Sequence, residues 1–65
     1  MPFIHVDLET GLTDQEKSEL TRQIVEVTHA AIGSAVEHIN VVLREWPGAN
    51  IVEAGRSLAA EQVTA

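Results

Sequence analysis

The stretch MPFIHVDL, residues 1–8, alternates apolar and polar side chains with the two-residue period of a β-strand. The two faces carry different residues: Ile4, Val6 and Leu8 on one, and Phe3, His5 and Asp7 on the other. We therefore expect a strand over residues 2–8 with one face packed against a helix. Residues 9–11, Glu-Thr-Gly, are expected to break it.

A helix is predicted next, because Thr13-Asp14-Gln15-Glu16 has the pattern of a capping box. Apolar or small residues recur at helical spacing on one face: Leu20, Ile24, Val27, Thr28 and Ala31. The polar residues lie mostly away from that face: Lys17, Glu19, Arg22, Gln23, Glu26 and His29. Gly33 stands just past the last turn, where glycine commonly ends a helix.

A second strand is predicted from residue 39 to the break at Pro47-Gly48, with Ile39, Val41 and Leu43 alternating with Asn40, Val42 and Arg44. Two strands joined by a crossover of about 25 residues that carries one helix form a β-α-β unit with parallel strands. Residues 51–55 predict a short strand or C-terminal hairpin, and residues 58–65 a frayed tail. The expected fold class is α+β, in a single domain over residues 1–65.

Composition limits the function classes. The 65 residues contain no cysteine and carry a net charge of −6, which argues against nucleic-acid binding and against an anionic membrane surface. A chain of this length buries only about 60% of the surface that its unfolded form exposes, so we expect self-association to stabilise it. Neither a signal peptide nor a run of roughly 20 apolar residues is visible, and cytoplasmic residence is therefore expected.

Pro2 is the first candidate catalytic residue, since removal of Met1 would leave a secondary amine at the end of a strand. Such an amine has an ordinary pKa of about 7.7 to 8.0, and desolvation lowers the pKa toward neutrality, where proton transfer is efficient. A retained Met1 would make this nitrogen an amide without useful basicity. The alternative is that Pro2 only begins the strand, where proline is tolerated.

The pieces MPFI, TGLTDQEKSEL, HINVVLREW and ANIVEAGRS, in this order and spacing, resemble the 4-oxalocrotonate tautomerase family of the tautomerase superfamily. The resemblance covers residues 2 to about 58. It implies short β-α-β subunits that pair into dimers and assemble into a hexamer, a trimer of dimers. It also implies that Pro2 is the acid/base that moves a proton between the enol oxygen and a carbon of a small carboxylate, without a cofactor.

Two positions depart from the family pattern. The resemblance places substrate-binding arginines where this chain has Leu12 and Asn40. A guanidinium fork suited to a carboxylate is thus missing twice, which weakens the expectation of a dicarboxylate substrate. Asn40 could still polarise a substrate carbonyl through its amide, whereas Leu12 could only pack.

Residues 50–56, Asn-Ile-Val-Glu-Ala-Gly-Arg, are similar to the matching stretch of the 3-chloroacrylic acid dehalogenases. The similarity implies that Glu53 activates water while Pro2 donates a proton, which is hydratase chemistry. The alternative is a solvated acid before a turn. The arginines that accompany this glutamate in the dehalogenases are absent, because Glu9 and Leu12 occupy their positions.

Further candidates complete the predicted site. Arg44 could bind a substrate carboxylate or instead form an ion pair with Asp7 or Glu45. Trp46 could line an apolar pocket or seal an oligomer interface, and Ile51 is expected to contact the substrate. Arg56 could reach a neighbouring site or stay at the surface. His5, His29 and His38 lack metal-ligand spacing, and no cofactor motif is present.

Three classes of function remain open. The first is a cofactor-independent enzyme, a tautomerase or a hydratase, and the second is a noncatalytic subunit of a hetero-oligomeric tautomerase. The third is a ligand-binding or purely structural oligomer without chemistry.

Overall fold

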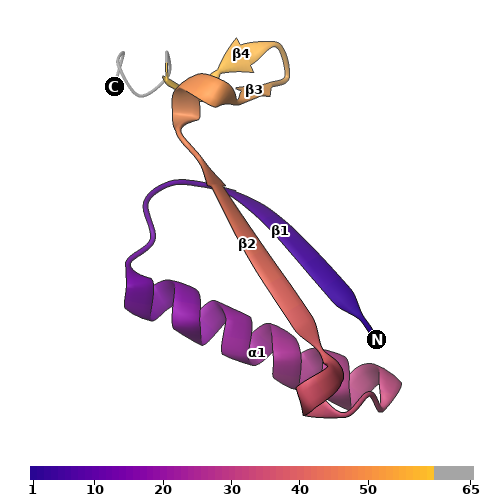
Figure 1. Cartoon of the computed structure of the whole chain (residues 1–65). Helices are drawn as coiled ribbons and strands as arrows, with labels where there is room; N and C mark the ends of the chain where they lie inside the picture. The colour runs from indigo at the N-terminus through magenta and orange to yellow at the C-terminus, as the bar shows by residue number, and fades with distance from the viewer. Residues whose placement is uncertain (60–65) are drawn as a thin grey trace.

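The computed structural model describes residues 1–59 and consists of a two-stranded sheet, one long helix and a terminal hairpin (Figure 1). The elements are β1 (Phe3–Glu9), α1 (Asp14–Ile32), β2 (Asn40–Trp46), β3 (Val52–Glu53) and β4 (Arg56–Ser57). Strands β1 and β2 are parallel, α1 lies along one side of them, and the antiparallel β3–β4 hairpin lies at the end of the sheet away from the N-terminus. The predicted α+β fold, with a β-α-β unit and a C-terminal hairpin, is confirmed.

The β1–β2 ladder runs from Phe3 opposite Asn40 to Glu9 opposite Trp46. The expected alternation along β1 is confirmed, since Ile4 is half-buried and Phe3 is exposed. The predicted break at Glu9 is wrong, however. Glu9 continues the strand because its register partner belongs to β2, and the next N–H, that of Thr10, donates to the Trp46 carbonyl at 3.0 Å.

The two ends of α1 follow the predicted signals. The N–H of Glu16 donates to the Thr13 hydroxyl at 3.1 Å, and the N–H of Thr13 donates to the Glu16 carboxylate at 2.9 Å. These reciprocal bonds satisfy two backbone donors that the first turn leaves unpaired. At the other end Gly33 has φ +72°, a left-handed conformation that glycine adopts without a Cβ clash.

The buried face of α1 differs from the predicted apolar stripe. Val27 is 67% exposed and Ala31 is exposed, because a sheet of two strands is too narrow to cover the whole stripe. Lys17, expected on the solvent side, is half-buried and ties the helix to β2 through a 2.7 Å ion pair with Glu45. The Glu45 hydrogen bond raises the pKa of Lys17, so the lysine stays charged.

The hairpin turns through Ala54 and Gly55, whose φ values are +51° and +79°. Two successive residues with positive φ are typical of a type I′ turn, and alanine is strained in that conformation. The N–H of Leu58 donates to the Ile51 carbonyl at 3.1 Å, so this residue of the predicted tail is held against the chain. Residues 60–65 of that tail lie outside the described residues.

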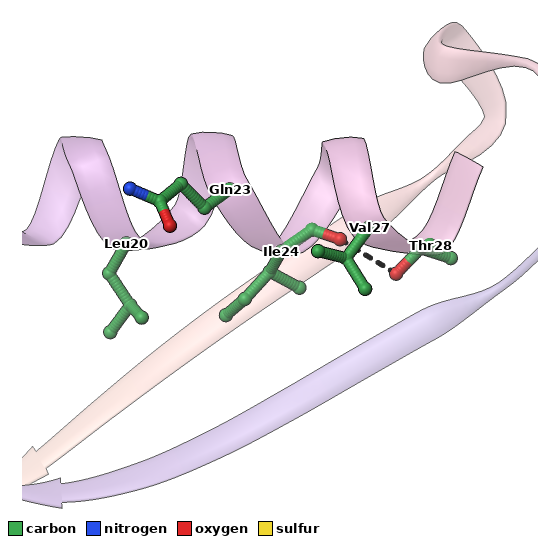
Figure 2. A pocket seen from close by; sticks show the side chains of 5 residues that line it. All are labelled: Leu20, Gln23, Ile24, Val27 and Thr28. Carbon is green, nitrogen blue, oxygen red and sulfur yellow. Dashed lines mark hydrogen bonds between the residues drawn. The ribbon is translucent and has the colours of Figure 1, made fainter. Parts of the chain in front are cut away.

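The chain encloses no hydrophobic core in its described part, where no apolar side chain is fully buried. Its radius of gyration is 15.1 Å, whereas a compact domain of this length has about 11 Å. An open groove of about 300 Å³ follows one side of α1 (Figure 2) and is lined by Leu20, Gln23, Ile24, Val27 and Thr28. Part of the apolar surface of the helix, including Val27 and Ile32, therefore remains open to solvent in the isolated chain.

Candidate functional site

Pro2 is held at the amino end of the sheet. The backbone N–H of Asn40 donates to the Pro2 carbonyl at 3.0 Å, and the Asn40 side-chain amide donates to the same oxygen at 3.3 Å. Pro2 is half-buried, whereas Met1 is 86% exposed. Removal of Met1 would thus disturb little packing and leave the proline ring in place at the start of β1.

A cavity of about 440 Å³ lies at the opposite end, where β1, β2 and the hairpin meet. The cavity is lined by Asp7, Leu8, Glu9, Trp46, Ile51, Glu53 and Leu58. The structure therefore brings together three of the predicted site residues: Trp46, Ile51 and Glu53. The cavity also contains the carboxylates of Asp7 and Glu9, which were not predicted as site residues.

Asp7 organises the wall of this cavity. Its carboxylate accepts a 2.9 Å hydrogen bond from the Trp46 indole N–H and lies 3.0 Å from the Arg44 guanidinium. The indole hydrogen bond, and after it the positive charge of Arg44, holds the pKa of Asp7 below its ordinary value of 3.8. Of the alternatives open for Arg44, the ion pair with Asp7 is the one present, and Glu45 pairs with Lys17 instead.

Pro2 and Glu53 do not meet within one chain. Strand β1, seven residues long, separates Pro2 from the cavity end, a span of about 23 Å at roughly 3.3 Å per residue. Leu12 is also remote from Pro2, since it follows the carboxyl end of β1 in the loop before α1. The chain therefore carries two separate groups of candidate residues, one at each end of its sheet.

Sequence reasoning missed Asp7, Leu8, Glu9 and Leu58 as cavity residues. A signal for Asp7 was available, because the β1–β2 register places it opposite Arg44 on one face of the sheet. Glu9 was predicted to be a turn residue and Leu58 to be part of a frayed tail. Their place in the cavity became clear only from the length of β1 and from the path of the chain after β4.

Within residues 1–59, no group of three or more histidine or carboxylate side chains lies in a position to hold a metal ion. In the same part of the chain, no helix combines the length and the apolar character needed to cross a membrane.

Comparison with known proteins identifies the family. The model of the tautomerase enzyme family matches residues 2–61, which is nearly the whole chain. The chain belongs to the tautomerase family. A probable tautomerase of Streptococcus agalactiae serotype III (strain NEM316) is 34% identical over 47 residues, which cover 72% of this chain and 78% of that protein. This tautomerase chain is accordingly an isomerase-type enzyme.

Solved structures of the family share this fold. N2, a member of the 4-oxalocrotonate tautomerase family, is 42% identical with a TM-score of 0.80, covering 88% of this chain and 89% of that one. A trans-3-chloroacrylic acid dehalogenase chain is 38% identical with a TM-score of 0.81, covering 88% of this chain and 98% of that one. The resemblance to both branches of the tautomerase superfamily is thereby confirmed.

Proposed function

We propose that this chain is a cofactor-independent tautomerase of small enol or unsaturated carboxylic acids, with Pro2 as its acid/base. The observation that carries the proposal is the position of Pro2 in a tautomerase-family chain. It is half-buried at the strand end, hydrogen bonded through its carbonyl, and follows an exposed Met1. Once Met1 is removed, the ring nitrogen is a base whose lone pair has a fixed direction.

The proposed reaction moves one proton and leaves the atoms otherwise unchanged. The neutral Pro2 amine takes the proton of the enol hydroxyl, so that the O–H bond breaks and a carbonyl forms. The electrons of the carbon–carbon double bond shift toward the terminal carbon of the conjugated system, which takes the proton back from the Pro2 ammonium. The amine ends neutral, ready for another turnover, and no cofactor is consumed.

We further propose that two subunits share each site. Pro2 lies at one end of its sheet and the cavity with Glu53 at the other, so only a neighbouring chain in the opposite direction can bring them together. A two-fold axis that relates two copies of β1 and β2 has this effect, because it sets the amino end of one sheet beside the carboxyl end of the other. Trp46 and Ile51 of the partner subunit would then line the substrate pocket.

The groove on α1 supports association of this kind. Leu20, Ile24 and Val27 line the groove on α1 (Figure 2), and covering this groove would supply apolar burial that the single chain lacks. We propose dimers that assemble further into a hexamer. A heterohexameric 4-oxalocrotonate tautomerase from Chloroflexus aurantiacus J-10-fl has the same fold, at 22% identity and a TM-score of 0.87 over 91% of this chain and 95% of that one.

A second candidate function is hydration of an unsaturated acid. The observation that favours it is the place of Glu53 in the cavity, beside the apolar Ile51 and Trp46. In this reaction the Glu53 carboxylate takes a proton from water as the water oxygen bonds to the β-carbon. The Pro2 ammonium gives its proton to the α-carbon, so the double bond becomes a single bond.

The pH dependence separates the two reactions. Tautomerisation begins with the neutral Pro2 amine, so kcat/KM rises as the pH increases through the pKa of the amine. Hydration begins with the protonated amine, so kcat/KM falls as the pH increases through the same pKa. The assay is ultraviolet spectroscopy with phenylenolpyruvate or 2-hydroxymuconate for the first reaction, and with an acrylic acid for the second.

The control is Pro2→Ala, with intact-mass spectrometry to establish that Met1 is absent from the purified chain. Turnover that does not exceed that of Pro2→Ala would exclude catalysis by the proline. Activity that appears only on mixing with a homologous chain, and that Pro2→Ala in this chain leaves unchanged, would instead identify this protein as the noncatalytic subunit of a hetero-oligomer.

A further inference from the structure

The Asn40 side chain uses both of its N–H groups inside the protein. Its amide nitrogen donates to the Pro2 carbonyl at 3.3 Å and to the His38 carbonyl at 3.1 Å. Both partners are carbonyl oxygens, which only accept hydrogen bonds, so the amide must present nitrogen and not oxygen to them. The polar atom left for a substrate is the amide oxygen, an acceptor that would repel a carboxylate.

The Pro2 carbonyl therefore accepts two hydrogen bonds from one residue, the second coming from the Asn40 backbone N–H at 3.0 Å. The backbone bond belongs to the parallel ladder and needs no particular side chain. The side-chain bond is specific to asparagine, and its link to His38 prevents the amide from rotating away. Together the two donors fix the carbonyl of the residue whose ring nitrogen is the proposed base.

We propose that Asn40 is a positioning residue for Pro2 and does not bind the substrate carboxylate. The inference rests on the proposed function of Pro2 as acid/base. It replaces the substrate-binding role that the sequence suggested for Asn40. Because the ring nitrogen and the carbonyl carbon are bonded to the same Cα, holding the carbonyl limits rotation of the ring and so the direction of its lone pair.

The hydrogen bonds also affect the amine electrostatically. Two N–H dipoles direct their positive ends at the Pro2 carbonyl, close to the nitrogen that would carry the ammonium charge. They disfavour the protonated form, so loss of the side-chain donor should raise the pKa of the amine. His5 is the nearest titratable group on the same strand and His38 the nearest before β2, so both are replaced by glutamine in the test protein.

The experiment compares Asn40→Ala with Val42→Ala in the full chain without Met1. Val42 lies two residues further along β2 on the same face and is 39% exposed. None of the hydrogen bonds to the Pro2 carbonyl comes from Val42. The amine of ¹⁵N-proline-labelled protein is titrated by NMR, and kcat and KM are measured with phenylenolpyruvate. Circular dichroism and sedimentation establish that each variant folds and assembles, and Asn40→Ser is used if Asn40→Ala does not.

We expect Asn40→Ala to lower kcat about three- to tenfold, the usual effect of one neutral hydrogen bond, with KM nearly unchanged. The Pro2 titration should move to higher pH in Asn40→Ala and stay in place in Val42→Ala. A raised KM with unchanged kcat, or an unmoved titration, would overturn the positioning role. The titration needs no turnover. It therefore still tests whether Asn40 acts on Pro2 if Pro2→Ala proves as active as the wild type and the proposed function fails.

Discussion

Mixing two inactive variants tests whether each site is shared between chains. Pro2→Ala removes the proposed base and leaves the cavity at the other end of the sheet intact. Ile51→Asp leaves Pro2 intact and places a carboxylate in the cavity wall, where it repels an anionic substrate. Each variant alone should be inactive, since every site in such an oligomer contains the same defect.

The expected recovery follows from the separation of the two groups within a chain. When equal amounts of the variants are unfolded together and refolded, a site is functional only if its proline comes from an Ile51→Asp chain and its cavity from a Pro2→Ala chain. Each condition is met half the time, so the mixture should recover about one quarter of the wild-type activity per site. A site built within one chain would recover none.

Turnover of phenylenolpyruvate before and after refolding is the readout. Val52→Asp is the matched control for Ile51→Asp, because it adds the same charge one residue away on a side chain that is 69% exposed and outside the cavity. This control should keep its activity. Recovery near zero, in mixtures that sedimentation identifies as mixed oligomers, would refute the shared site.

Three further outcomes are expected. Leu12→Arg should lower the KM for 2-hydroxymuconate about tenfold and leave that for phenylenolpyruvate nearly unchanged, since a guanidinium pairs with the additional carboxylate; equal effects on both substrates would contradict this. The pKa of Asp7 is lowered in the folded chain, so its bonds to Trp46 and Arg44 stabilise the fold above pH 3.8. This stabilisation is lost as the pH falls through the lowered pKa of the folded chain. The fluorescence of the single tryptophan should therefore change below pH 3.8 in the wild type, and Asp7→Asn should lack this transition. Ala54→Asn should raise the free energy of unfolding by about 0.5–1 kcal/mol in thermal denaturation, because asparagine tolerates the positive φ better than alanine does; an unchanged or lower melting temperature would show that the turn stores no such strain.

The sequence predicted the elements where local signals and tertiary contacts agree. The capping box at Thr13 and the glycine at position 33 fix the ends of α1 through bonds within the helix itself, so residue spacing was sufficient. The end of β1 was mispredicted because Glu-Thr-Gly reads as a turn. Its partner in β2 lies 37 residues further along the chain, and only that pairing extends the ladder to Glu9.

The candidate site was harder to predict, because its geometry depends on which end of a strand each residue occupies. Residue types and the family resemblance gave Pro2 and Glu53 their proposed roles. Neither could show that β1 separates the two in one chain, or that the Asn40 amide is already engaged with two carbonyls. The apolar stripe of α1 was overestimated because a sheet of two strands covers only part of it, and Val27 and Ala31 stay exposed.

The charges around the cavity and the departures from the family pattern both favour a substrate with a single carboxylate. Among the described residues that line the cavity, Asp7, Glu9 and Glu53 are acidic and none is basic, and the guanidinium of Arg44 is engaged by Asp7. Like charges repel, so a second carboxylate on the substrate would be disfavoured beside these acidic side chains. A substrate with one carboxylate and an apolar body is compatible with the Trp46 and Ile51 walls, and it does not require the arginines that Leu12 and Asn40 replace.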